Sequence, residues 1–573
     1  MNSLSLYFKI LLSLIIGSLI GLSVIYQSVN AQDQDVPDYT SPVPQYTFPS
    51  TLEEQEEALR TNPLMQRFIE SREQLSDDPY RPIYHFMNPE GNLNDPNGFS
   101  FWNGNWHLFY QAYPPEDPRQ HWGHAVSKDL VHWRDLPLAI YPNPERASFS
   151  GSALVEEDRV IAHYHGTEVG NLVAVSDDPL LLNWEKVTGE AVIPMVNRDT
   201  VLIDGEPHPH HVYDPFIWEE DGVYYSISGW RDRHESSDRL YATAELYKSE
   251  DLENWEYVHP FVEGVELFTM PEDDLACPYF WPIGDRYILL FFSHYSGGQY
   301  LLGDYDKERN KFVPTSHGFL NHGPVRPGGV HAPSAAPDGQ GGVINIFNIN
   351  APRINPSEGW NQIMSSPMRL TLRDTDELGI EPAGNFESLR YDHQKVEPMT
   401  IPANDEIVFE HIQGNAMEII AVIDPADAQH VELNVLRSPG KEEYTAITFY
   451  NKTGYTQRDN GRQYSMLTID SAKSSTRSDV QARPPENAPL YLEEGENLEL
   501  RIFIDKSVVE VYANGKQYAA VRVYPGLQES TGVSIRSQGQ PSELISLDSW
   551  QMQNTWEISL DEWYEKPVWQ AEE

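Results

Sequence analysis

Residues 103–110 read Asn-Gly-Asn-Trp-His-Leu-Phe-Tyr, a polar turn that leads into an aromatic, alternating strand. The same order of turn and strand recurs four more times, at 158–164, 221–227, 284–291 and 341–347. Short strands that repeat roughly every 50 to 70 residues are typical of blades arranged around a central axis. Five such hairpins predict a five-bladed β-propeller, and a large β-sandwich with chance similarity is the weaker alternative.

A second repeat interleaves with the first. Ser-Lys-Asp-Leu-Val-His-Trp at 127–133 is echoed at 176–184 and at 249–255, and each copy ends in Trp. These units extend the propeller over 81–392. Plain alternating runs such as 417–422 and 498–504 then replace them and predict a C-terminal β-sandwich over 405–555. The predicted fold class is therefore all-β, a propeller followed by a sandwich.

The composition excludes several classes of partner. The chain has 573 residues, of which 12% are aromatic, and a formal net charge of −47. Such an acidic surface repels nucleic acid and anionic lipid, so neither is an expected partner. The 87 acidic residues are best explained by solubility: they keep the surface hydrated, in a medium whose salt screens their mutual repulsion.

The N-terminus predicts export. Lys9 precedes an apolar stretch over 10–25, and Val29-Asn30-Ala31 offers small residues to signal peptidase. We therefore expect a signal peptide over 1–31, an acidic, Pro-rich linker and a helical or irregular prelude over 32–80, and a secreted product with no membrane contact after cleavage. An uncleaved anchor is the alternative, because the apolar stretch approaches the length that spans a bilayer. Cys277 is the single cysteine, which excludes an intrachain disulfide.

Three acidic segments fall on successive predicted blades, at 94–98, 212–215 and 272–278. Acidic residues at the start of innermost propeller strands converge on the central axis. The first segment, Asn-Asp-Pro-Asn-Gly, would by itself be an ordinary β-turn. His85 and Phe86 before it, and Trp106, Tyr110 and Gln111 after it, give it more weight.

At this point the chain resembles glycoside hydrolase family 32, the invertases, levanases and inulinases. Of the family signature Trp-Met-Asn-Asp-Pro-Asn-Gly, the core from Asn94 to Gly98 is intact here, and Leu93 stands where the family has Met. Further matches follow in order over 81–525: Phe109-Tyr110-Gln111, Trp122-Gly123-His124, Phe149-Ser150-Gly151-Ser152 and, in the sandwich, Arg501-Ile502-Phe503-Ile504-Asp505. The resemblance implies a five-bladed propeller plus a sandwich, in agreement with the repeats.

The resemblance also implies roles for individual residues. Asp95 corresponds to the nucleophile, and Asp214 to the residue that binds fructosyl hydroxyls and steadies the transition state. Tyr213 stands where the family has Arg, so a planar cation is replaced by a neutral phenol. The residues expected to bind substrate are Asn94, Gln111, Trp122, Phe149 and Ser150.

The third segment departs most from the family. The family has Glu-Cys-Pro at this position, and its Glu is the general acid and base. This chain has Ala276-Cys277-Pro278 instead. If the strand is regular, residues two apart share one face, which favours Asp274 as the replacement acid. Glu272 is the second candidate, and loss of acid catalysis is the third.

These residues predict a retaining hydrolase of sucrose, levan or inulin that needs no metal or other cofactor. His208, His210 and His211 lack a matched ligand set and are better explained as a polar loop. Two alternatives stay open: a related furanosidase of the arabinoside type, and a carbohydrate-binding protein that has lost catalysis. The sequence leaves open which fructoside is used, exo or endo action, transfer to a sugar instead of water, and the oligomeric state.

Overall fold

A computed structural model describes residues 38–197, 200–203, 205–208, 212–233, 239–350, 359–374, 376–456, 461–481 and 483–571. The predicted signal peptide, His210 and His211 lie outside these residues. Two short helices, α2 (Leu52–Thr61) and α3 (Pro63–Leu75), occupy the prelude. Within the described ranges, no helix has the length and apolar character needed to cross a membrane.

Antiparallel sheets then follow one another, and described residues between 92 and 382 form five of them. The first sheet contains β1 (Asn92–Trp102), β2 (Asn105–Tyr113), β3 (His121–Ser127) and β4 (Trp133–Ile140). The second contains β5 (Ser148–Val155), β6 (Val160–Gly166), β7 (Gly170–Ser176), β8 (Glu185–Lys186), β9 (Ile193–Asn197), β10 (Thr200–Ile203) and β11 (Glu206–His208). The third contains β12 (Pro215–Glu220), β13 (Val223–Arg233), β14 (Leu240–Ser249) and β15 (Glu256–Pro260).

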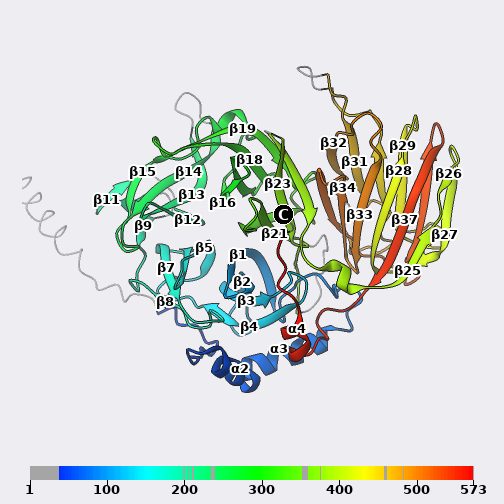
Figure 1. Ribbon diagram of the computed structural model, residues 1–573. Helices are drawn as coiled ribbons and strands as arrows, with labels where there is room; N and C mark the ends of the chain where they lie inside the picture. Colours follow the sequence, from blue (N-terminus) through cyan, green and yellow to red (C-terminus); the bar gives the residue numbers. More distant parts are fainter. Residues whose placement is uncertain are drawn as a thin grey trace, which may run out of the picture. The chain divides into compact units, whose positions relative to one another are not determined.

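The fourth sheet contains β16 (Ala276–Ile283), β17 (Arg286–Ser293), β18 (Gly297–Asp306) and β19 (Lys311–Phe319), and a 3₁₀ turn, η1 (Val265–Leu267), precedes it. The fifth contains β20 (Val330–Pro337), β21 (Val343–Ile349), β22 (Ile363–Met364), β23 (Met368–Asp374) and β24 (Glu377–Pro382). The first strand of each sheet contacts the first strand of the next, from β1 through β5, β12, β16 and β20 back to β1. Figure 1 shows β1, β5, β12 and β16 on the inner side of their sheets.

The turn residues explain the hairpins that begin these sheets. Asn103-Gly104 joins β1 to β2, and Asp221-Gly222 joins β12 to β13. All four residues have positive φ, between 48° and 82°. Two-residue turns of this kind match the twist of paired strands, and Asn, Asp and Gly tolerate them best. Each polar turn that the sequence repeats therefore connects the first and second strands of a sheet.

Two further sheets face each other across an apolar core and form the sandwich. One contains β25 (Arg390–Val396), β26 (Met399–Ile401), β28 (Ala416–Asp424), β33 (Leu498–Asp505), β34 (Val508–Ala513), β35 (Gln517–Arg522) and β37 (Ser542–Met552). The other contains β27 (Glu406–Gln413), β29 (His430–Arg437), β30 (Thr445–Tyr450), β31 (Ser465–Asp470), β32 (Glu486–Leu490) and β36 (Gly532–Gln538). A 3₁₀ turn, η2 (Phe386–Leu389), leads into β25. The predicted all-β fold of a propeller followed by a sandwich is confirmed.

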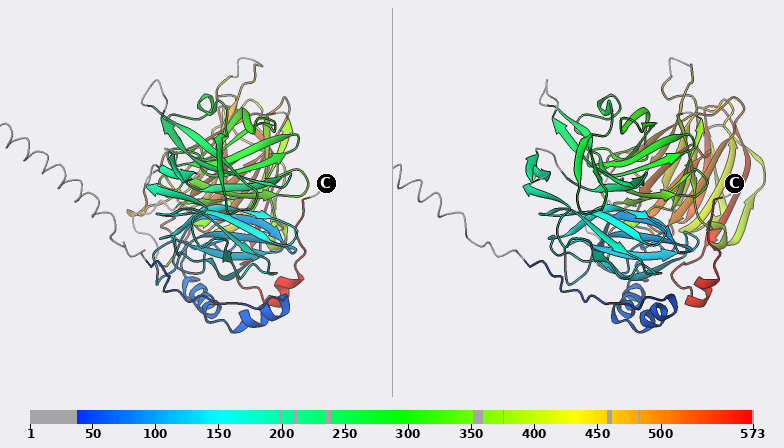
Figure 2. Two further views of the ribbon diagram at one scale, coloured as in Figure 1. Left: turned by 90° about the vertical axis from the view of Figure 1, so that its left-hand side faces the viewer. Right: turned by 60° about the vertical axis from the view of Figure 1, so that its left-hand side comes forward.

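The helices cover the outer strand of the first sheet. Figure 2 shows α2 and α3 (blue) beside the blue and cyan strands, with the C-terminal helix α4 (Leu560–Glu565, red) next to them. Glu56 of α2 accepts two hydrogen bonds from Arg134 of β4, at 2.7 and 2.8 Å. Arg72 of α3 forms a bidentate pair with Asp135 at 2.5 and 2.7 Å. These segments cover a strand edge that would otherwise be open to pairing.

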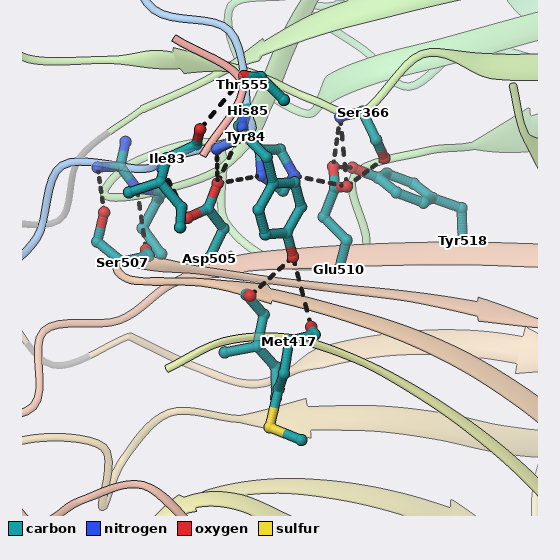
Figure 3. Close-up of polar contacts among 12 residues, drawn as sticks. Ile83, Tyr84, His85, Ser366, Met417, Asp505, Ser507, Glu510, Tyr518 and Thr555 are labelled. Atoms are coloured by element: carbon teal, nitrogen blue, oxygen red, sulfur yellow. Dashed lines mark hydrogen bonds and ion pairs between the residues drawn. The ribbon is translucent and has the colours of Figure 1, made fainter. Parts of the chain in front are cut away.

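A buried polar network joins the segment before β1 to the sandwich (Figure 3). Both lie within one compact unit, Thr40–Glu573. The two ring nitrogens of His85 each lie 3.0 Å from a carboxylate, Nδ1 from Asp505 and Nε2 from Glu510. Asp505 also accepts the backbone N–H groups of Ile83, Tyr84 and His85 at 2.8 to 2.9 Å. The segment that leads into β1 is therefore anchored on β33 and β34.

Candidate active site

Asp95 lies near the start of β1, where the pairing with β2 is irregular between Leu93 and Pro96. Such a bulge turns a side chain out of the regular alternation of the strand. The Oδ2 atom of Asp95 accepts hydrogen bonds from Ser150 Oγ at 2.8 Å and from Gln111 Nε2 at 3.3 Å. Three elements, β1, β2 and β5, thus hold one carboxylate.

The predicted polar residues around Asp95 form a single network. Gln111 Nε2 also donates to Ser150 Oγ at 2.6 Å, and Gln111 Oε1 accepts from Asn94 Nδ2 at 3.0 Å. Asn94 Oδ1 accepts from Gln362 Nε2 at 3.0 Å, and Gln362 lies in none of the motifs that identified the other residues. The structure therefore brings together Asn94, Asp95, Gln111 and Ser150.

The second predicted carboxylate, Asp214, directly precedes β12 and is 8% exposed. Its Oδ2 atom lies 3.3 Å from the backbone N of Cys277 and 3.4 Å from Cys277 Sγ. The same Sγ lies 3.8 Å from Asp95 Oδ2. One thiol therefore lies against both carboxylates.

Burial dominates the electrostatics of these three groups. It raises the pKa of Asp214 to about 6, and the negative charge of Asp95 adds to the effect. Burial also raises the pKa of Asp95, while the hydrogen bond from Ser150 opposes that rise. Burial and both carboxylates raise the pKa of the Cys277 thiol, so the thiol stays protonated and can donate.

The aromatic residues divide into two groups. Trp122 is 0% exposed: its Nε1 donates to Phe149 O at 2.8 Å, and its ring packs on Tyr164. Its ring is thus enclosed on all sides in this structure, and its contact with sugar stays a prediction. Phe149 is only half-buried and lies edge-on to His165, and His165 in turn stacks on Tyr213 at 5.0 Å.

Tyr213, which replaces the family Arg, thus joins an aromatic row with His165 and Phe149. Burial lowers the pKa of His165 to about 4, so this imidazole is neutral at physiological pH. The row presents no formal cation where the resemblance would place one. Sequence reasoning missed His165, because its position follows from the pairing of β6 and not from a motif.

The third acidic segment is not a regular strand. β16 begins at Ala276, so Asp274 and Glu272 precede it. The period-two argument that placed them on one face with Ala276 is therefore wrong. Glu272 is exposed in a turn, with a φ of 74°. Asp274 is 2% exposed, and its Oδ1 and Oδ2 atoms accept from the backbone N and the Nδ1 of His294, at 2.9 and 2.8 Å.

His294 was missed by the sequence analysis. It directly follows β17, and its side chain is 50% exposed. Its contact with Asp274 depends on the register between β16 and β17, for which the sequence carries no short signal. Among the described residues, no group of three or more His, Cys, Asp or Glu side chains could hold a metal ion.

The comparisons with known proteins agree with this architecture. The model "Glycosyl hydrolases family 32 N-terminal domain" matches residues 85–382, and "Glycosyl hydrolases family 32 C terminal" matches residues 385–551. A levanase of Bacillus subtilis is 29% identical over 527 residues, which cover 84% of this chain and 71% of the relative. A sucrose-6-phosphate hydrolase of Escherichia coli is 27% identical over 490 residues, which cover 80% and 94%.

Solved structures give the same fold. Fructan 1-exohydrolase IIa from Cichorium intybus superposes with a TM-score of 0.71 at 22% identity, over 83% of this chain and 98% of that one. The two family models together extend over both the propeller and the sandwich. The chain belongs to glycoside hydrolase family 32.

Proposed function

We propose that this glycoside hydrolase cleaves β-fructofuranosidic bonds in sucrose or fructans by a double displacement, with Asp95 as the nucleophile. The observation that carries the proposal is the polar network in which Ser150 and Gln111 hold Asp95 while Cys277 lies between it and Asp214. Its relatives, a levanase and a sucrose-6-phosphate hydrolase, support this substrate class. We further propose that each of the five sheets is one propeller blade, which would bring their first strands together at this site.

Each carboxylate has a distinct task in this mechanism. Asp95, ionised, attacks the anomeric carbon and forms a fructosyl ester, which water then hydrolyses. Asp214 binds adjacent sugar hydroxyls, and its charge strengthens that grip as positive charge develops on the ring. The aromatic row of Phe149, His165 and Tyr213 gives the sugar an uncharged wall. Neither an arabinoside-type furanosidase nor a binding protein without activity is favoured.

The exchange Asp95→Asn tests the proposal. It keeps the shape of the side chain but removes the nucleophile, so we expect kcat on sucrose or inulin to fall by about 10⁴-fold or more. The thermal unfolding midpoint should stay near that of the wild type. Sugar release from sucrose, inulin, levan and an aryl arabinofuranoside would be compared for both proteins.

Asp285→Asn is the matched control, because Asp285 is an exposed turn residue between β16 and β17. It should leave activity unchanged. Mass spectrometry of the quenched wild-type reaction should find a fructosyl adduct on the peptide that contains Asp95. Near-normal activity of Asp95→Asn, or a first product of inverted configuration, would exclude this mechanism.

We also propose that the chain is exported and that its N-terminal segment is removed. Lys9, the apolar stretch over 10–25 and Val29-Asn30-Ala31 support this proposal. The mature protein would then meet its sugar outside the cytoplasm and would contact no membrane. Cleavage and retention as an anchor give different N-termini, which a mass measurement separates.

A further inference from the structure

The proposed double displacement needs a proton donor about 5 to 5.5 Å from the nucleophile, and Ala276 cannot supply one. We propose that His294 is the general acid and base of this enzyme, and that Asp274 is the positioning residue that orients its imidazole. This inference rests on the proposed function and deepens it. It differs from the expectation that Asp274 itself delivers the proton.

The strand register brings His294 to the position that lacks an acid. In the antiparallel pair of β16 and β17, Ala276 lies opposite Phe292. His294 lies two residues beyond Phe292, and Asp274 two residues before Ala276. Both residues lie just outside the paired strands, and the two hydrogen bonds between them hold His294 beside Asp274 at this end of the sheet. The imidazole of His294 is thereby close enough to Asp95 and Asp214 for the charges of both carboxylates to act on it.

The hydrogen bonds orient the ring. Asp274 accepts from both the backbone N and the Nδ1 of His294, so the imidazole is fixed at two points. Nδ1 is thereby engaged, and Nε2 is the nitrogen left to face a substrate oxygen. Asp274 is 2% exposed while the His294 side chain is 50% exposed. A buried carboxylate that orients a solvent-facing imidazole is the arrangement used by hydrolytic triads.

The charges around His294 favour its protonated form. Burial lowers the pKa of the imidazole, but the hydrogen bond to Asp274 and the charges of Asp274, Asp214 and Asp95 outweigh burial and raise it above its usual value. The nearby His331 on β20 is neutral, because burial lowers its pKa to about 4. Arg231 on β13 donates to Tyr295 Oη at 2.9 Å. The charges of Asp274 and Glu272 act on this guanidinium.

The proton balance is complete with these groups. As Asp95 attacks the anomeric carbon, the bond to the leaving oxygen breaks, and its electron pair takes the proton from Nε2 of the imidazolium. The neutral imidazole keeps its Nδ1 proton on Asp274. In the second step Nε2 removes a proton from water, the water oxygen bonds to the anomeric carbon, and the ester electrons return to Asp95.

The two carboxylates expected from the sequence are less suited to this task. Both oxygens of Asp274 are occupied by His294, and its side chain is buried. Glu272 is exposed in the turn that precedes β16, and its side chain is not enclosed with the buried carboxylates. The half-exposed imidazole is the group that combines access with a charge suited to donation.

The exchange His294→Asn tests the inference, because the Asn amide can replace Nδ1 as a donor to Asp274 but cannot transfer a proton. We expect kcat/KM for sucrose to fall by about 10² to 10⁴-fold. For an aryl β-fructoside with a nitrophenolate leaving group, which needs little protonation, the loss should stay below about tenfold. Azide should accelerate turnover of that substrate and yield fructosyl azide, because azide attacks the ester without base assistance.

The pH profile supplies a second readout. Activity that needs the imidazolium falls as pH rises through the raised pKa of His294, and this alkaline limb should be absent from His294→Asn. Asp274→Asn should keep the limb but move it to lower pH, because the carboxylate that raises the pKa is gone. An unmoved limb in Asp274→Asn would overturn its role as a positioning residue.

His393→Asn is the matched control, since His393 forms a similar pair with Asp548 at 2.7 Å in the sandwich, with a half-exposed imidazole. It should match the wild type. Two outcomes would overturn the inference and leave the proposed function intact. One is that His294→Asn loses equal activity on sucrose and on the aryl β-fructoside. The other is that only Glu272→Gln loses activity on sucrose while keeping it on the aryl β-fructoside. A wild-type protein that cleaves no fructoside would instead overturn the proposed function, and the inference with it.

Discussion

Cys277 lies between the two carboxylates and has an uncommon backbone conformation. Its φ is +49°, a left-handed conformation that is uncommon outside glycine and asparagine, at an irregularity in the pairing of β16 with β17. This backbone directs both its N–H and its thiol toward Asp214. The protonated thiol is a weak donor. It moderates the mutual repulsion of Asp95 and Asp214 and is not itself a nucleophile.

Cys277→Ala should therefore move the acid limb of kcat/KM to higher pH. The wild-type limb reflects ionisation of the Asp95–Asp214 pair, in which Asp214 has a pKa of about 6. Without the thiol donor the ionised form loses a hydrogen bond worth about 1 kcal/mol, which corresponds to roughly half to one pH unit. Cys277→Ser keeps a donor and should show a smaller displacement. An unchanged limb in both variants would show that the thiol has no electrostatic role.

The residues of the site differ in how far the sequence reveals them. Asn94, Asp95, Gln111 and Ser150 lie in short contiguous motifs, and their strands bring them together as expected. His294 lies in no such motif, since its contact with Asp274 follows from strand register. Register depends on long-range pairing, which a single sequence does not encode locally.

The sequence repeat that ends in Trp corresponds to a repeated turn in the structure. In the segments 127–133, 176–184 and 249–255, the indole Nε1 of the last Trp donates to the carbonyl of a Leu three residues earlier. That Leu has positive φ in each copy, between 54° and 69°. An aspartate in each segment accepts backbone N–H groups. Because these contacts are local, the pattern predicts the turn, whereas it could not predict which strands of the propeller and sandwich pair.

The network around His85 connects β1 to the sandwich and should make stability depend on pH. Burial lowers the pKa of His85, but Glu510 and Asp505 outweigh it and raise the pKa to about 9. A group whose pKa is raised on folding contributes stability that is fully present below its unfolded value, about 6.5, and is lost as pH rises through about 9. His85 therefore stabilises the protein most at neutral and acidic pH.

His85→Gln should lower the free energy of unfolding at pH 7 by about 3 to 5 kcal/mol, because it leaves two buried carboxylates without their cation. The difference from the wild type should shrink between pH 7 and 10. Urea unfolding at several pH values measures it. His393→Gln, at a half-exposed pair, should cost less than about 1 kcal/mol at every pH. A penalty for His85→Gln that is constant with pH would exclude a charged His85.

The net charge of −47 gives the chain an acidic surface over both the propeller and the sandwich. A neutral sugar is not repelled by this charge, whereas nucleic acid and anionic lipid are. Salt screens the field at the surface, with a Debye length of about 8 Å at physiological ionic strength, but screens buried groups much less. The local carboxylates around His294 therefore matter more for catalysis than the distant surface charge does.

The N-terminus of this acidic chain should direct its export from the cell. The apolar stretch over 10–25 is shorter than the roughly 20 residues of a typical membrane span, and small residues at Val29 and Ala31 suit signal peptidase. When the full chain is expressed in a bacterial host, the soluble extracytoplasmic product should begin at Gln32, as measured by intact mass. Ala31→Phe should block cleavage and leave the whole chain in the membrane fraction. A wild-type chain that keeps Met1 and sediments with membranes would establish the anchor instead.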